Sequence, residues 1–212
     1  MKTNELIQKL SEELEPSHPL PGPVLSTAFC LVLSLIFVAG SVPVFSARPD
    51  LGSALRAPLL PAMVVLLVTI SALAFSTLIR SSYPGRNDFR RTGWMALGLT
   101  TLLLVSLWGL GLVAIPGRAP FAVDGILCAR DIFLDALIPA ACLFTALRRR
   151  APTRPKLSGC LAGVASAIVG AVAFEFCCAN NQPWHLLEWH LVIPLVTGAL
   201  LGYFLGGWVL RW

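Results

Sequence analysis

The sequence predicts an all-α integral membrane protein, a bundle of six transmembrane helices preceded by a short amphipathic helix. Composition is the first observation behind this prediction: 56% of the 212 residues are hydrophobic and 13% are charged, whereas a soluble domain carries about a quarter charged residues. The second is that the apolar residues form runs of twenty or more. Each run is long enough to cross a hydrocarbon core of about 30 Å.

The predicted spans cover residues 23–45, 57–80, 93–115, 124–147, 157–178 and 189–210. The fourth span is the least hydrophobic because it carries Arg130, Asp131 and Asp135. Residues 1–22 then form an N-terminal helix with a Pro-rich linker, and residues 23–212 form the transmembrane domain. Little chain remains for a separate soluble domain, so we expect neither an enzyme nor a nucleic-acid-binding fold.

Basic residues predict the orientation, because cytoplasmic loops retain Lys and Arg. The loops after the second and fourth predicted spans hold most of them: Arg80, Arg86, Arg90, Arg91, Arg148, Arg149, Arg150, Arg154 and Lys156. The alternate loops hold only Arg48, Arg56 and Arg118. This asymmetry predicts a multi-pass protein of the bacterial inner membrane with both termini in the cytoplasm. It also explains the net charge of +5 without a nucleic-acid partner.

On this topology, thiols and imidazoles gather at the outer face. Cys128 lies near the start of the fourth span, Cys177 and Cys178 close the fifth, and His185 and His190 follow in the next loop. Thiolate and imidazole are ligands for soft or borderline metal ions, and the thiols could instead form a disulfide on an oxidising side. Only one of the two adjacent cysteines can face a given partner, because they point about 100° apart on a helix. Cys30, Cys142 and Cys160 are expected to be apolar helix residues without a role.

Charged residues extend this region into the predicted spans. Cys128, Asp131 and Asp135 share one helical face, and Glu175 lies one turn before Cys178. Charges inside a membrane normally face the bundle interior and have a partner. Arg130 is the basic residue at this depth, and we expect it to pair with Glu175 or Asp131. Such a pair could either fix the helix register or take part in signalling.

Small residues at four-residue spacing predict close helix packing. Gly159 and Gly163 open the fifth span, and Gly198, Gly202 and Gly206 follow one face of the sixth. Stripes of this kind allow two helix backbones to approach closely in a membrane. They favour a compact bundle over a wide pore.

The N-terminal tail reads as a short helix that ends at Pro16. One face is apolar, and the rest is charged and net negative; the apolar face consists of Leu6, Ile7, Leu10 and Leu14. A helix this short is marginal alone, and a helix that lies on a membrane is usually basic. We therefore expect the apolar groove of a partner protein to cover these side chains, with a solvated tail as the alternative.

Three features together resemble the NrsF-like membrane anti-sigma factors, which are negative regulators of an extracytoplasmic-function sigma factor. They are the opening segment from Met1 to Leu10, the six predicted spans, and the string from Cys178 through His185 to Trp189-His190. The resemblance covers essentially the whole chain. It implies that the tail sequesters a cytoplasmic sigma factor at the bilayer. It also implies that Cys128 and Cys178 sense metal or oxidative stress, and no resident cofactor is required.

Two other functions remain compatible with the residues. A small metal permease would place polar residues along several spans, whereas here they concentrate in one. A thiol–quinone oxidoreductase would also use outer-face cysteines, but it usually carries a paired Cys-x-x-Cys motif, which this sequence lacks. We therefore expect an anti-sigma factor that releases its partner when a periplasmic metal ion or oxidant reaches the cysteines and histidines.

Overall fold

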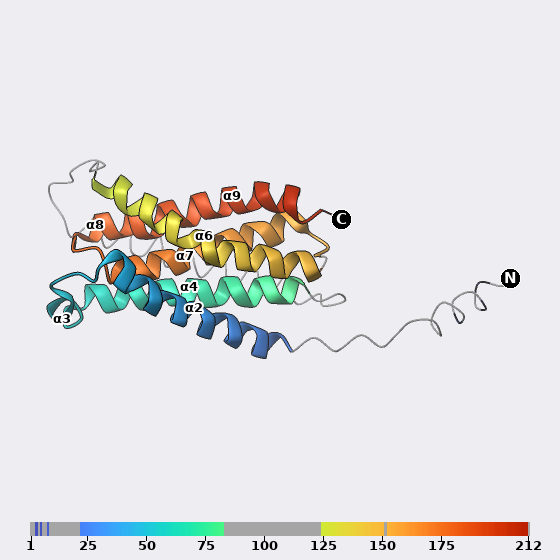
Figure 1. The fold of residues 1–212 in the computed structure, drawn as a ribbon, viewed down its shortest axis with the longest axis horizontal. Coiled ribbons are helices and arrows are strands. Elements are labelled where there is room, and N and C mark those ends of the chain that lie inside the picture. Colours follow the sequence, from blue (N-terminus) through green and yellow to red (C-terminus); the bar gives the residue numbers. More distant parts are fainter. Residues whose placement is uncertain are drawn as a thin grey trace.

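The computed structural model describes residues 22–82, 124–150 and 152–211, together with Thr3, Glu5 and Gln8. All regular structure within these residues is helical (Figure 1). The elements are α2 (Pro23–Phe45), α3 (Leu51–Ala54), α4 (Leu59–Ser81), α6 (Asp124–Arg150), α7 (Pro155–Glu175), α8 (Pro183–His185), the π-helix η1 (Leu186–Val192) and α9 (Ile193–Val209). The predicted all-α class is confirmed.

The long helices lie side by side, with α4, α6 and α9 running in one direction and α2 and α7 in the other, so the bundle has two distinct ends (Figure 1). We call one the arginine end, because α4 and α6 finish there with Arg80, Arg148, Arg149 and Arg150. We call the other the thiol end, because α6 begins there with Cys128 and α7 finishes there just before Cys178. Helix α2 begins and α9 finishes at the arginine end.

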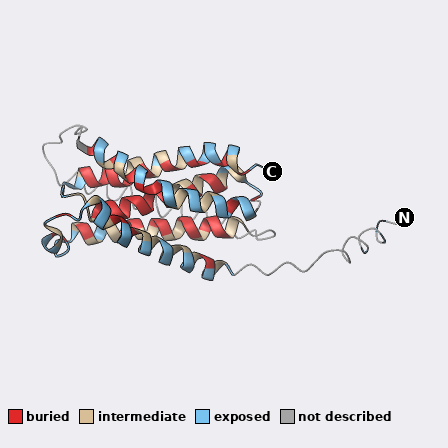
Figure 2. Ribbon diagram, in the orientation of Figure 1, coloured by how far each residue is buried: buried red, intermediate tan, exposed pale blue. Residues whose placement is uncertain are grey.

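Helix α7 forms the centre of the bundle and packs against α4, α6 and α9 (Figures 1 and 2). Fourteen of its residues are buried, most of them Gly, Ala, Ser or Val. A Cβ atom on Gly159 or Gly163 would collide with a carbonyl oxygen of α9, and one on Gly170 would lie 2.6 Å from the carbonyl oxygen of Ile132 on α6. The predicted close packing through glycine is therefore confirmed. Because these glycines have no side chain, the backbone of α7 lies directly against the backbones of α9 and α6.

Within the described residues, four helical segments are long and apolar enough to cross a membrane, whereas the sequence predicts six spans over the whole chain. They are Pro23–Phe45, Leu59–Ser81, Pro155–Glu175 and Pro183–Val209. The fourth predicted span is present as α6, an unbroken helix of 27 residues, but its charged residues keep it outside this set. The third predicted span and most of the predicted N-terminal helix lie outside the described residues.

The boundaries of the last two spans differ from the prediction. Helix α7 ends at Glu175 rather than at Cys178, because the amides of Phe176 and Cys177 donate to carbonyl oxygens three residues earlier and tighten the final turn. The last membrane-length segment begins at Pro183 rather than at Trp189. Proline suits the first position of a helix because it has no N–H to leave unpaired. His185 and His190 therefore lie in helical turns and not in a loop.

Candidate functional site

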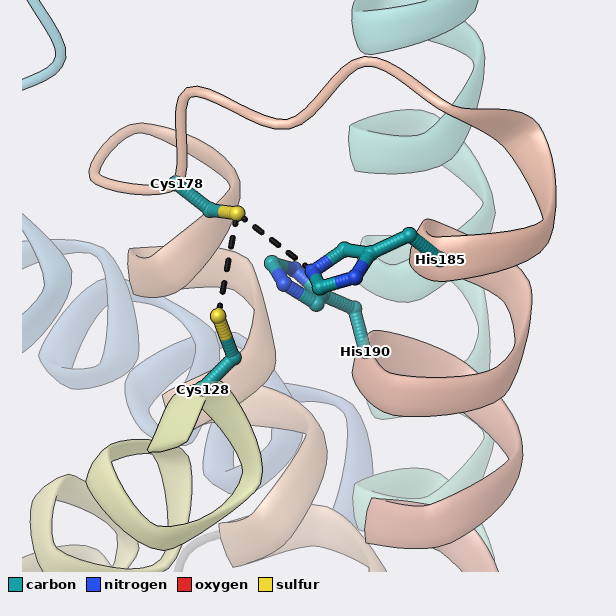
Figure 3. Close-up of side chains that lie close together, drawn as sticks. All are labelled: Cys128, Cys178, His185 and His190. Atoms are coloured by element: carbon teal, nitrogen blue, oxygen red, sulfur yellow. Dashed lines mark hydrogen bonds between the residues drawn. The ribbon is translucent and has the colours of Figure 1, made fainter. Parts of the chain in front are cut away.

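Four side chains converge at the thiol end of the bundle (Figure 3). Their ligand atoms all lie within 4.8 Å of one another, and they belong to Cys128, Cys178, His185 and His190. The two Sγ atoms are 3.8 Å apart, and the Cys178 Sγ lies 3.6 Å from Nε2 of His185. Both histidines are buried and both cysteines are half-buried. We call these four residues the Cys/His cluster.

Three separate elements bring the cluster together. Cys128 lies in the second turn of α6, Cys178 follows the end of α7, and the histidines come from α8 and η1. The start of α6 can approach η1 because Gly125 has no side chain: the indole of Trp189 occupies the position where a Cβ would be. Gly125 precedes Cys128 by one helical turn, so this contact also sets the position of Cys128.

The π-helical turn η1 places the two histidines on one face. They are five residues apart, which in an α-helix would turn them about 140° away from each other. In a π-helix the hydrogen bond runs from i to i+5, so residues at that spacing return toward the same side. The two rings meet edge to face with centroids 5.5 Å apart. A π-helical turn inside a longer helix is rare and often marks a functional site.

A buried carboxylate orients the second histidine. Nδ1 of His190 lies 3.1 Å from Oε1 of Glu175, and both side chains are completely buried. Nε2 of His190 is buried without a hydrogen-bond partner in the described part of the chain, and one ring nitrogen of His190 belongs to the atoms gathered in the cluster. The carboxylate therefore holds the ring by Nδ1 and leaves Nε2 open beside the cluster.

The two adjacent cysteines have opposite properties. The contact with Cys128 lowers the pKa of the Cys178 thiol, and the neighbouring imidazoles of His185 and His190 act in the same direction against the effect of burial. Burial raises the pKa of the Cys177 thiol instead. The Sγ of Cys177 lies 4.0 Å from the carbonyl oxygen of Val42 on α2. Of the pair, Cys178 faces the cluster and Cys177 packs against α2.

Of the two pairings predicted for Arg130, the structure contains the one with Asp131. Nε of Arg130 lies 2.7 Å from Oδ1 of Asp131, and 61% of the Arg130 side chain is exposed. Arg130 therefore faces outward and does not pair with Glu175, whose partner is His190. The expectation that it faces the bundle interior was wrong. A long Arg side chain near a helix end can carry its charge to the rim of the bundle. Asp135 is buried, as expected, and it lies outside the Cys/His cluster.

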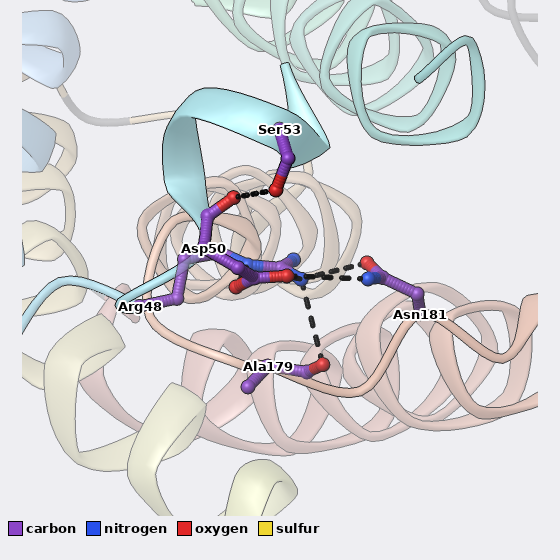
Figure 4. Close-up of polar contacts among 5 residues, drawn as sticks. All are labelled: Arg48, Asp50, Ser53, Ala179 and Asn181. Carbon is purple, nitrogen blue, oxygen red and sulfur yellow. Dashed lines mark hydrogen bonds and ion pairs between the residues drawn. The ribbon is translucent and has the colours of Figure 1, made fainter. Parts of the chain in front are cut away.

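An arginine from the first loop holds the segment that carries Cys178 (Figure 4). The guanidinium of Arg48 donates two hydrogen bonds to Asp50, at 2.7 and 2.8 Å. It also donates to Oδ1 of Asn181 at 2.8 Å and to the carbonyl oxygen of Ala179 at 3.4 Å. The backbone N–H of Arg48 donates to the carbonyl oxygen of Phe176 at 3.0 Å. We call this set of contacts the Arg48 strap.

The strap has the electrostatics of a strong ion pair. The hydrogen bond from Arg48 lowers the pKa of the Asp50 carboxyl, and the same bond raises the pKa of the guanidinium. The Arg48 side chain is fully buried, whereas 40% of Asp50 is exposed. Sequence reasoning treated Arg48 only as a minority charge of an outer loop. The sequence signal was an arginine in a loop with few basic residues, followed two residues later by the acidic Asp50.

The geometry of the cluster suits two kinds of chemistry. Two sulfur and two imidazole ligands match the donor set of a four-coordinate soft or borderline cation. The same two thiols, now in van der Waals contact, could also be oxidised to a disulfide if their sulfur atoms closed to about 2.05 Å. The cluster is thus a candidate site for a metal ion or for an oxidant.

The fold and this site define a small helical bundle of membrane-spanning composition, with a thiol–imidazole cluster at one end. The chain belongs to the NrsF family, described as negative regulator of sigma F, whose family model matches residues 10–212. It is similar over its full length to the anti-sigma-F factor NrsF of Caulobacter vibrioides, at 29% identity. It is 27% identical to a probable anti-sigma-F factor NrsF of Azospira oryzae, again over the whole of both chains. No solved structure matches the chain. The family is one of regulators rather than of enzymes.

Proposed function

We propose that this protein is an inner-membrane anti-sigma factor that holds an extracytoplasmic-function sigma factor through its N-terminal helix. A periplasmic metal ion or oxidant acts at the Cys/His cluster and causes release of the sigma factor. The observation that carries this proposal is full-length similarity to proteins named anti-sigma-F factors. The position of the cluster, at the opposite end of the bundle from the start of α2, supports the separation of input from output.

The proposed orientation places the arginine end in the cytoplasm and the thiol end in the periplasm. The arginines at the ends of α4 and α6 favour this orientation, because basic residues are retained on the cytoplasmic side. Helix α4 finishes at the arginine end and α6 begins at the thiol end. These positions support the proposal that residues 93–115, the third predicted span, cross the membrane between them. Both termini are then cytoplasmic. A reporter fused after Trp212 should be active as a cytoplasmic enzyme, and activity as a periplasmic enzyme would refute the orientation.

The output of the proposed mechanism is the apolar face of the tail, formed by Leu6, Ile7, Leu10 and Leu14. Each of these side chains would enter an apolar groove on the sigma factor. Polar substitution of Leu10 and Leu14 together should release the sigma factor and switch its genes on without a signal. A pull-down with the full-length chain measures this directly. Unchanged repression at normal protein levels would show that the tail is not the sigma-binding element.

The input of the proposed mechanism is the Cys/His cluster, so its variants should have the opposite phenotype. Cys128→Ser and Cys178→Ser should still repress but should not respond to the inducer. If the signal is a metal ion, His185 and His190 variants should fail as well, because a borderline cation uses imidazole and thiolate together. If the signal is disulfide formation, the histidine variants should respond almost normally. Cys142→Ser, an exposed position on α6, is the control; a parental response in all four cluster variants would exclude the cluster as sensor.

A further inference from the structure

We infer that the Cys/His cluster is a closed four-coordinate site for a soft or borderline cation such as Cu⁺, Zn²⁺ or Cd²⁺, and that Glu175 positions the His190 ligand. This inference deepens the proposed function, on which it rests for its biological meaning, by choosing metal coordination over thiol oxidation. It depends on distances within the cluster and on one buried contact outside it.

The spacing of the ligand atoms matches a tetrahedral ion. Two thiolates bound at about 2.3 Å on a tetrahedral ion lie about 3.8 Å apart, and a thiolate and an imidazole nitrogen lie about 3.6 Å apart. The observed separations are 3.8 Å between Cys128 and Cys178 and 3.6 Å between Cys178 and Nε2 of His185. A cation could therefore bind with little movement of these three groups.

The fourth ligand is already oriented by the protein. Glu175 and His190 are both fully buried, and their contact at 3.1 Å occupies Nδ1 of the imidazole. Nε2 remains without a hydrogen-bond partner among the described residues, and His190 contributes a ring nitrogen to the ligand atoms that lie within 4.8 Å of one another. A carboxylate on the far nitrogen is the arrangement that orients metal-binding histidines and raises their basicity. A histidine that only packed in a core would not need one nitrogen fixed and the other left open.

Metal titration of the reduced, full-length chain in lipid nanodiscs tests the site. Co²⁺ and Cd²⁺ are the probes, because both give thiolate-to-metal charge-transfer absorption and Co²⁺ also reports tetrahedral geometry. We expect one ion per chain, loss of the charge-transfer band in Cys128→Ser and Cys178→Ser, and no change in Cys142→Ser. Absence of the band in the parent chain, or its persistence in both cluster serine variants, would overturn the inference.

The role of Glu175 has its own test. Glu175→Gln keeps the size of the side chain and should weaken metal affinity about 10–100-fold while leaving stoichiometry and spectrum intact. Glu188→Gln is the matched control, because Glu188 lies on η1 and outside the cluster. Equal effects of the two variants would exclude the positioning role. Metal binding is measured without a sigma factor: a chain that captures its sigma factor but binds no metal would refute this inference alone, whereas the reverse would refute only the proposed function.

A second observation, the Arg48 strap, carries a separate inference. We propose that the strap couples the Cys178 segment to α2, the helix that continues directly into the N-terminal linker. Its contacts join the end of α2 to the segment between Phe176 and Asn181 through both backbone and side chain. The ring of Phe45, the last residue of α2, also packs edge to face on Phe174 of α7 with centroids 4.9 Å apart.

Helix α2 is suited to transmit a movement because it is attached mainly at this end. Three of its 23 residues are buried, and much of its ribbon is coloured as exposed (Figure 2). Several of its large apolar residues are among the exposed ones. At the arginine end, an open groove separates it from α4, lined by Pro23, Thr27, Leu31, Ser76 and Arg80. Few buried residues of α2 would therefore oppose a movement that starts at the Cys178 segment.

The test separates sensing from coupling. Arg48→Gln and Asn181→Ala should bind Co²⁺ as the parent chain does and should repress its sigma factor, but their induction by metal should be lost or strongly reduced. Arg56→Gln, an exposed arginine of the same loop, should respond normally. Asn181→Ala decides the question if Arg48→Gln does not accumulate, because Asn181 is exposed and its loss leaves the ion pair of Arg48 and Asp50 intact. Normal induction in both variants, or loss of metal binding in both, would overturn the coupling role.

Discussion

Helices α2 and α7 are both apolar enough to cross a membrane, yet they occupy opposite positions in the bundle. Fourteen of the 21 residues of α7 are buried, against three of the 23 in α2. The buried helix consists mostly of small residues, and the exposed helix carries the large ones, such as Phe29, Leu35 and Ile36. In a membrane, lipid tails solvate a leucine as well as a protein core does, so close packing rather than hydrophobicity selects the central helix.

The largest expected difference between the two helices comes from truncating a large side chain. Ile168 on α7 is completely buried, whereas 59% of Leu35 on α2 is exposed. Ile168→Ala should lower the free energy of unfolding by about 2–5 kcal/mol, because it leaves a cavity among residues that cannot collapse. Leu35→Ala should change it by less than about 0.5 kcal/mol. Reversible unfolding in mixed micelles measures both, and equal losses would mean that α2 is packed as tightly as α7.

An intermediate effect is expected from adding one methyl group to the contact between α7 and α9. A Cβ on Gly163 would meet the backbone carbonyl oxygen of Gly198, which cannot move without separating the helices. Gly163→Ala should therefore cost about 1–3 kcal/mol of unfolding free energy, in spite of the better helix propensity of alanine. The same unfolding assay measures it. A stabilised Gly163→Ala protein would show that the two helices can separate without penalty.

The smallest effect, and one of opposite sign, is expected from the same substitution in α2. No atom of another helix lies within 4 Å of a Cβ built on Gly40, so alanine adds no clash there. Gly40→Ala should stabilise the protein by about 0.5–1 kcal/mol, because glycine loses more backbone freedom in a helix. This variant is the matched control for Gly163→Ala. Destabilisation by Gly40→Ala would indicate that a partner covers this face of α2.

The Cys/His cluster and the Arg48 strap differ in how far they were predictable. The four cluster residues and the outer level at which they meet were predicted, because hydropathy fixes the height of each residue along a span. Which of Cys177 and Cys178 faces the cluster was left open, because the answer depends on where α7 ends. The strap was not predicted, because Arg48 and Asn181 are 133 residues apart and no periodic pattern connects them.

The sequence by itself determined the helical class, the level of the thiols and the concentration of arginines at one end, since these follow from the hydropathy and charge of local segments. Tertiary structure alone decided that α7 is central, that η1 turns His185 and His190 to one side, and that Glu175 pairs with His190 while Arg130 pairs with Asp131. Local patterns specify position along the helix axis. Lateral neighbours depend on which backbones can approach, and that is a property of the whole bundle.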